Sequence, residues 1–111
     1  MSDTLSQNKI CDLNDMLRKE LKGGTIIQTN AYAALNIDIR NEFLNLIRAK
    51  DEFDPDDDPY GEHDFGSESI GSITVFWKID YFDNMMSGLS ADPSDPSMTK
   101  RVMTLMLASE Y

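Results

Sequence analysis

Residues 51–64 contain eight carboxylate side chains and no lysine or arginine. The whole chain has a formal net charge of −10, so this segment holds most of the negative charge. Closely spaced carboxylates repel one another and are stabilised by nearby cations. A segment of this kind can bind a divalent metal ion, dock onto a basic partner protein, or remain solvated by water and salt.

The spacing of Asp54, Asp56 and Asp58 matches the first three ligand positions of an EF-hand calcium loop. The match then ends, because Pro59 stands where that loop requires glycine and Phe65 stands where it requires a bidentate glutamate. A regular EF-hand is therefore excluded. An irregular site for a divalent cation stays open as an alternative.

His63, between Glu62 and Asp64, is the single histidine, which excludes a multi-histidine zinc or iron centre. A histidine beside carboxylates can still act as a general base. A metal-dependent hydrolase is therefore an alternative, and its candidate residues are Asp56, Asp58, His63, Asp64 and Asp80. The chain contains no glycine-rich phosphate loop and no Gly-x-Ser-x-Gly motif. The simpler interpretation is that His63 and Asp64 bond to backbone groups at the entry to a hairpin.

Cys11 is the only cysteine, so we exclude an internal disulfide and every cysteine-based zinc site. Its ordinary interpretation is a small, partly buried apolar residue. No apolar run approaches the roughly 20 residues of a membrane-spanning helix, and no secretory signal is visible, so we expect a cytoplasmic protein. The pI near 4.3 disfavours direct binding to nucleic acid or to anionic membranes and favours a basic protein partner.

The elements that position these residues follow from periodicity. Apolar residues recur at helical spacing over 9–22 and 36–50, the second with Asn36 or Asp38 as its cap. Residues 25–29 are β-branched and predict a buried strand, and 64–82 predict a hairpin that turns at Gly71-Ser72. Trp77 falls on the core face of this hairpin. The pair Asp95-Pro96 indicates the start of a third helix over 96–109.

These elements predict one α+β domain over residues 1–111, in which a small antiparallel sheet of about three strands packs against three helices. Residues 1–8 are expected to form a disordered tail, and 51–64 an acidic loop. A loop of this length in a small domain is usually functional or disordered.

Three segments resemble an uncharacterised bacterial family, a domain of unknown function common in alphaproteobacteria and their mobile elements. They are DPYGEHDFG at 58–66, FWKIDYFD at 76–83 and LASEY at 107–111. Leu13-Asn14-Asp15 with Arg18 is also similar to the opening helix of that family. The resemblance implies a small cytoplasmic protein of bacterial, phage or plasmid origin, and it implies no activity.

The negative charge of residues 51–64 and the resemblance to this family together favour a non-enzymatic inhibitor or regulator. Such a protein would dock its acidic loop onto a basic surface of another protein. In its sharpest form this is an anti-defence protein, such as an anti-CRISPR or antirestriction factor, that mimics DNA and occupies a groove meant for nucleic acid. No cofactor is expected in this interpretation, although a divalent cation stays open. The residues predicted to contact the partner are Asp54, Asp56, Asp57, Asp58, Tyr60 and Glu62.

Overall fold

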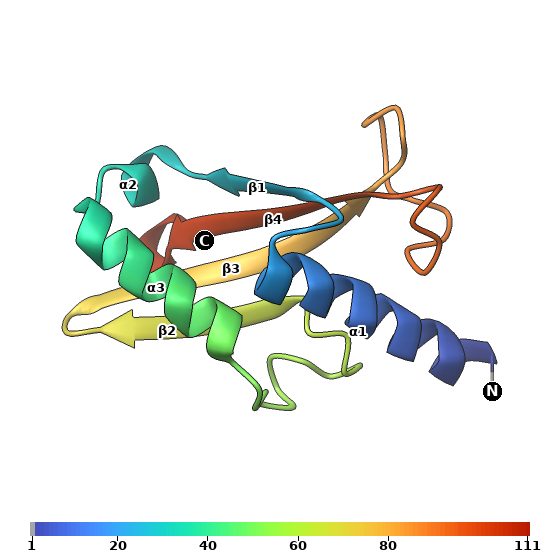
Figure 1. The fold of residues 1–111 in the computed structure, drawn as a ribbon, viewed down its shortest axis with the longest axis horizontal. Helices are drawn as coiled ribbons and strands as arrows, with labels where there is room; N and C mark the ends of the chain where they lie inside the picture. Colours follow the sequence, from blue (N-terminus) through green and yellow to red (C-terminus); the bar gives the residue numbers. More distant parts are fainter. Residues whose placement is uncertain (1) are drawn as a thin grey trace.

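The structure is a computed structural model that describes the backbone of residues 2–111 and the side chains of residues 8–111 (Figure 1). The helices are α1 (Ser2–Glu20), α2 (Asn30–Ala33) and α3 (Ile37–Ala49), followed after the last strand by the short 3-10 helix η1 (Ala108–Glu110). The strands are β1 (Thr25–Gln28), β2 (Phe65–Ile70), β3 (Ile73–Phe82) and β4 (Lys100–Leu107). The predicted α+β class is confirmed.

The four strands form one sheet in the order β1-β4-β3-β2. The predicted hairpin is confirmed as the antiparallel pair β2–β3, and β3 also pairs antiparallel with β4. Gly71, at the hairpin turn, has a φ of +59°, a conformation that glycine adopts at no steric cost. The predicted strand over 25–29 is β1, which runs parallel to β4. It was predicted to be buried, but it lies at the edge of the sheet and is mostly exposed. The sheet therefore has four strands instead of about three, and it is mixed instead of antiparallel.

The third predicted helix, over residues 96–109, is wrong because most of this segment is the interior strand β4. Residues on both of its faces are buried, namely Arg101, Val102, Met103, Leu105 and Met106. A strand buried on both faces has a nearly continuous apolar sequence, which lacks the alternation that identifies a half-exposed strand. Asp95 caps a turn instead of a helix, since its Oδ1 accepts a hydrogen bond of 2.9 Å from the Ser97 amide.

Residues 1–8 were predicted to form a disordered tail, but residues 2–8 belong to helix α1. Met1 lies outside the described residues. Helix α3 begins as predicted after Asn36, whose side chain accepts a hydrogen bond from the Asp38 amide. Among residues 2–111, no helix is long and apolar enough to cross a membrane.

The hydrophobic core lies between the sheet and the helices, which cover one face of it (Figure 1). Trp77 is the predicted core anchor, and its side chain is completely buried. The core comprises Leu17, Tyr32, Phe43, Ile47, Val75, Trp77, Ile79, Met103 and Leu105. This layer fixes α1 and α3 in front of the strands, so the acidic segment that connects α3 to β2 passes beside α1.

The opposite face of the sheet carries a second, smaller aromatic cluster. The ring centroid of Phe65 lies 5.4 Å from that of Phe76 and 5.6 Å from that of Tyr111. Phe76 and Tyr111 meet edge to face at 5.4 Å. Such pairs stabilise beyond the apolar area that they bury. This face is therefore partly covered by the residues that follow β4.

Candidate functional site

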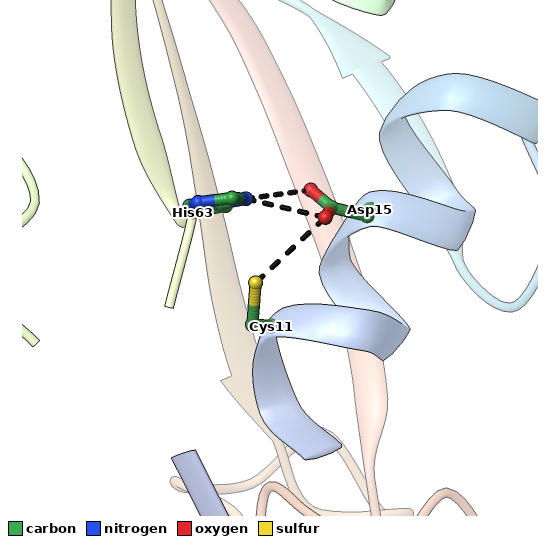
Figure 2. Close-up of side chains that lie close together, drawn as sticks. All are labelled: Cys11, Asp15 and His63. Atoms are coloured by element: carbon green, nitrogen blue, oxygen red, sulfur yellow. Dashed lines mark hydrogen bonds and ion pairs between the residues drawn. The ribbon is translucent and has the colours of Figure 1, made fainter. Parts of the chain in front are cut away.

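Three side chains of types that bind metals meet where α1 faces the acidic loop (Figure 2). Cys11 and Asp15 are one turn apart on α1, so both project from the same side of the helix. His63 comes from the loop 51–64. The His63 Nδ1 atom lies 2.9 Å from Asp15 Oδ1 and 3.2 Å from Asp15 Oδ2. The Cys11 thiol donates a hydrogen bond of 3.7 Å to Asp15 Oδ2. We call these three residues the Cys–Asp–His cluster.

The loop holds His63 in place through Asp58. The His63 backbone has a φ of +56°, which is uncommon for a residue other than glycine. Its amide donates a hydrogen bond of 3.0 Å to Asp58 Oδ1, and its Nε2 lies 3.8 Å from Asp58 Oδ2. The His63 ring also stacks on Phe53 with centroids 3.9 Å apart, and Phe53 packs edge to face on Trp77. The acidic loop is therefore anchored to the core through an aromatic side chain and a buried carboxylate.

Arg18 holds Asp15 from the other side of the cluster. Its completely buried guanidinium donates through Nη2 to Asp15 Oδ1 at 2.8 Å. Its Nη1 donates to the backbone oxygens of Ile47 and Lys50 at 2.7 and 2.8 Å, where α3 ends. The last carbonyls of a helix have no partner within the helix, so Arg18 satisfies them and fixes the start of the acidic loop.

These contacts set the protonation of the cluster. Burial, with a further contribution from the Asp15 carboxylate, raises the pKa of the Cys11 thiol to about 12. Burial acts to raise the pKa of Asp15, but hydrogen bonds from Arg18 and His63 outweigh it and lower that pKa below the ordinary value. At neutral pH Cys11 is therefore a neutral thiol beside an ionised carboxylate. A nucleophilic cysteine requires the thiolate, so the arrangement does not favour nucleophilic catalysis by Cys11.

The cluster also differs from a catalytic triad in the groups that lie next to the two imidazole nitrogens of its histidine. In a triad, one imidazole nitrogen is held by a carboxylate and the other faces the nucleophile. Here, Nδ1 faces Asp15 and Nε2 faces Asp58. Both nitrogens are thus directed at carboxylates. This geometry favours an electrostatic or metal-binding role over general base catalysis.

The residues predicted to contact a partner are divided by the structure. Asp54, Asp56, Asp57 and Tyr60 are exposed, with Tyr60 at 68%. Asp58 is buried beneath His63, and its side chain is only 4% exposed. Glu62 is half-buried, and its backbone oxygen accepts a hydrogen bond from Asn14 Nδ2.

A pocket of about 510 Å³ lies where the acidic loop meets the helix-free face of the sheet. Its wall carries four carboxylates and a single lysine, and Lys78 Nζ lies 3.3 Å from Asp80 Oδ2. The pocket is lined by Asp56, Asp57, Pro59, Tyr60, Asp64, Phe65, Lys78, Ile79, Asp80 and Tyr111. We call it the acidic–aromatic pocket.

The five residues named for a hydrolase do not form one group. Asp56, Asp64 and Asp80 line the acidic–aromatic pocket, whereas Asp58 and His63 contact each other beside α1. Among residues 8–111, the side chains that come together as a possible metal site are Cys11, Asp15 and His63. Only His63 is common to the two sets.

Sequence reasoning missed Cys11, Asp15 and Arg18 as site residues. The presence of a single cysteine excludes zinc sites that are built from several cysteines. It does not exclude a mixed site, which needs only one thiolate. A signal was present, because residues 11, 15 and 18 follow helical spacing and form one polar stripe on a helix. The contact with His63, 48 positions away from Asp15, is not visible in local patterns.

Comparison with known protein families gives a match to a family model. Residues 28–110 match the family model described as "Protein of unknown function (DUF3768)". This range is well over half of the chain, so the chain belongs to that family, and the resemblance to a family of unknown function is confirmed. The match includes His63 and the acidic loop, whereas Cys11 and Asp15 precede it. No curated protein and no solved structure matches the chain.

Proposed function

We propose that this member of the DUF3768 family is a non-enzymatic protein that binds a basic surface of a partner protein. Contact is made by the exposed carboxylates of the acidic loop and by the acidic–aromatic pocket. The observation that carries the proposal is the composition of that pocket, in which four carboxylates and the rings of Tyr60, Phe65 and Tyr111 surround one lysine.

The chemistry of the pocket fits a lysine or arginine side chain of the partner. Carboxylates accept charge-assisted hydrogen bonds from guanidinium and ammonium groups, and aromatic faces attract the same cations. Burial, followed by the carboxylates of Asp58 and Asp80, raises the pKa of Asp64 above its ordinary value. Negative charge at this point is thus incompletely balanced, and an incoming cation would relieve the repulsion.

The loop presents its carboxylates in a fixed arrangement. Asp54 Oδ1 accepts a hydrogen bond of 2.9 Å from the Asp56 amide, and Asp54 O accepts bonds from the amides of Asp57 and Asp58. At its two ends the loop is held by Arg18 and by His63. Preorganised contacts lose less conformational entropy on binding. The loop therefore has the properties of a docking surface, with Asp54, Asp56, Asp57 and Tyr60 as its exposed members.

Asp58 has a different role in this proposal from the one that the sequence suggested. Its buried carboxylate positions His63, so we assign it to the support of the loop. Glu62 lies at the edge of the surface. In the narrowest form of the proposal, the partner is a nucleic-acid-binding protein of a defence system, and the loop competes with DNA phosphates for lysine and arginine residues. That narrower form is motivated by the resemblance to proteins of mobile elements.

The test is a fluorescence anisotropy titration with a labelled arginine-rich peptide as the model basic surface. The variant is the triple substitution Asp54→Asn, Asp56→Asn and Asp57→Asn. The matched control is Asp12→Asn, Glu20→Gln and Glu42→Gln, which removes three exposed carboxylates from α1 and α3. The loop variant should weaken binding at least tenfold, and the control should weaken it less than twofold. Added salt should weaken binding to the wild type.

The titration contradicts the proposal if the two triple variants bind the peptide equally, since affinity would then follow net charge alone. A second variant, Tyr60→Ala, separates the pocket from the loop. It leaves the charge unchanged and removes an exposed ring, so reduced binding with the same salt dependence supports an aromatic anchor in the pocket.

A further inference from the structure

We propose that Cys11, Asp15 and His63 bind a divalent transition-metal ion of the zinc type. This site lies on the α1 side of the acidic loop and is separate from the acidic–aromatic pocket. The inference does not depend on the proposed partner binding.

The positions of the three ligand atoms carry the proposal. The thiol sulfur, one carboxylate oxygen and one ring nitrogen lie within 4.8 Å of one another. Asp15 Oδ2 is 3.7 Å from Cys11 Sγ and 3.2 Å from His63 Nδ1. Zinc binds N, O and S ligands at about 2.0–2.3 Å, which places neighbouring ligand atoms of a tetrahedron roughly 3.3–3.7 Å apart. The separations of Asp15 Oδ2 from Cys11 Sγ and from His63 Nδ1 therefore already suit an ion, which would replace the hydrogen bonds of the cluster.

The residues around the cluster orient its ligands as metal sites require. Arg18 occupies Asp15 Oδ1, which leaves Oδ2 for an ion. When a histidine binds a metal through one nitrogen, its other nitrogen commonly faces a carboxylate. Asp58 Oδ2, 3.8 Å from His63 Nε2, supplies that group. Asp58 also accepts the His63 amide hydrogen, and Phe53 stacks on the ring, so the position of the imidazole is fixed.

The set of ligands selects the class of ion. Calcium and magnesium prefer sites made entirely of oxygen atoms, whereas a thiolate with an imidazole favours zinc and related ions. The formal charges also balance. The Cys11 thiolate, Asp15 and Asp58 contribute three negative charges, which equal the sum of a divalent ion and the Arg18 guanidinium. The thiol proton passes to solvent as the sulfur–metal bond forms.

The site is open enough for an ion to enter. The side chains of Asp15 and His63 are 27% and 25% exposed, and Cys11 is half-buried. Three protein ligands leave one tetrahedral position for water. An ion at this point would connect α1 directly to the loop 51–64, so it should raise the melting temperature of the domain.

The experiment uses the full chain after treatment with a chelator, titrated with Co²⁺ as a spectroscopic substitute for zinc. The wild type should bind one equivalent and show a sulfur-to-cobalt charge-transfer band, which Zn²⁺ then removes. Cys11→Ser should abolish this band, and His63→Gln should weaken binding at least tenfold. Asp15→Asn should also weaken binding at least tenfold. Asp12→Asn, an equal change of charge on exposed α1 surface, is the matched control and should bind as the wild type does.

Circular dichroism checks that each variant keeps the fold, and Cys11→Ser is the decisive variant because it replaces only the sulfur atom. The proposal is overturned if the wild type binds no Co²⁺ or if Cys11→Ser keeps the charge-transfer band. It is also overturned if Asp12→Asn weakens binding as much as Asp15→Asn. Addition of Zn²⁺ should raise the melting temperature of the wild type and leave that of Cys11→Ser unchanged.

Discussion

Asn14 on α1 and Arg101 on β4 are joined by a buried hydrogen bond of 2.8 Å between Arg101 Nε and Asn14 Oδ1. The Asn14 amide nitrogen donates in turn to Tyr81 Oη at 2.7 Å and to the backbone oxygen of Glu62 at 3.0 Å. Arg101 also bonds to the Pro93 carbonyl and lies over the Tyr81 ring. One asparagine thus connects the first helix, two strands and the end of the acidic loop.

Asn14→Ala should therefore destabilise the domain. The substitution leaves a buried guanidinium N–H, a phenol and a backbone carbonyl without this partner, at a cost of about 3 kcal/mol in the free energy of unfolding. Urea unfolding measures it. Asn45→Ala, at an exposed position of α3, is the control and should stay within about 0.5 kcal/mol of the wild type. Equal stability of the two variants would contradict a structural role for Asn14.

Gly66 on β2 has no room for a side chain. A Cβ atom at this position would lie 2.4 Å from Trp77 Nε1 and 2.5 Å from two ring carbons. Gly66→Ala should therefore displace the core tryptophan and lower the stability by about 2 kcal/mol, with a change in tryptophan fluorescence. Gly88→Ala is the control, because a Cβ there meets only Asp83 Oδ2 at 3.7 Å. An unchanged melting temperature for Gly66→Ala would contradict this prediction, because it would mean that β2 shifts away from Trp77 at no cost in stability.

The parts of the fold that could be predicted are those with a local signal. The hairpin alternates apolar and polar residues around a Gly-Ser turn, and Asn36 caps α3; both features act within a few residues. The strand β4 could not be predicted in this way. Met103 and Met106 both lie in its interior sequence and are buried, and their spacing is the same as on a helical face. Only pairing with β1 and β3, which is distant in sequence, decides between the two structures.

The candidate site shows the same limit. The acidic loop and its exposed residues follow directly from composition, and His63 was singled out because it is the only histidine. The inward direction of Asp58 could not be predicted, since nothing in a run of aspartates distinguishes the one that supports the loop. Asp15 and Arg18 acquire their roles from contacts with residues 29 to 48 positions away.

Arg18→Lys should test how the start of the acidic loop is held. A lysine keeps the positive charge, but its single ammonium group cannot reproduce the planar guanidinium that reaches Ile47 O, Lys50 O and Asp15 together. We expect a loss of about 2 kcal/mol in the free energy of unfolding. Arg48, at an exposed position of α3, donates one hydrogen bond through Nε to the backbone oxygen of Lys19. Arg48→Lys should cost less than about 0.5 kcal/mol, because water replaces an exposed hydrogen bond. Similar losses in the two variants would mean that the guanidinium geometry at position 18 is unimportant.

Glu62 should make the stability depend on pH with a defined sign. Burial, and then the carboxylates of Asp64 and Asp58, raise its pKa above the ordinary value of 4.5. The native state then binds the proton more tightly than the unfolded state, so the free energy of unfolding falls as pH rises through the interval above that value. Glu62→Gln removes the charge and should stabilise the domain at neutral pH. Below the ordinary pKa the variant and the wild type should be equally stable.

Urea unfolding at neutral pH and at a pH below 4.5 measures the difference in stability between Glu62→Gln and the wild type. Glu52→Gln is the control, because Glu52 is exposed in the same loop. The Glu52 variant should show no comparable gain at neutral pH. A Glu62→Gln variant that is less stable than the wild type at neutral pH would mean that its carboxylate makes a favourable contact that outweighs burial and repulsion. In the proposed partner binding, a cation from the partner would also offset the repulsion among Glu62, Asp64 and Asp58. A basic peptide should consequently stabilise the wild type more than Glu62→Gln.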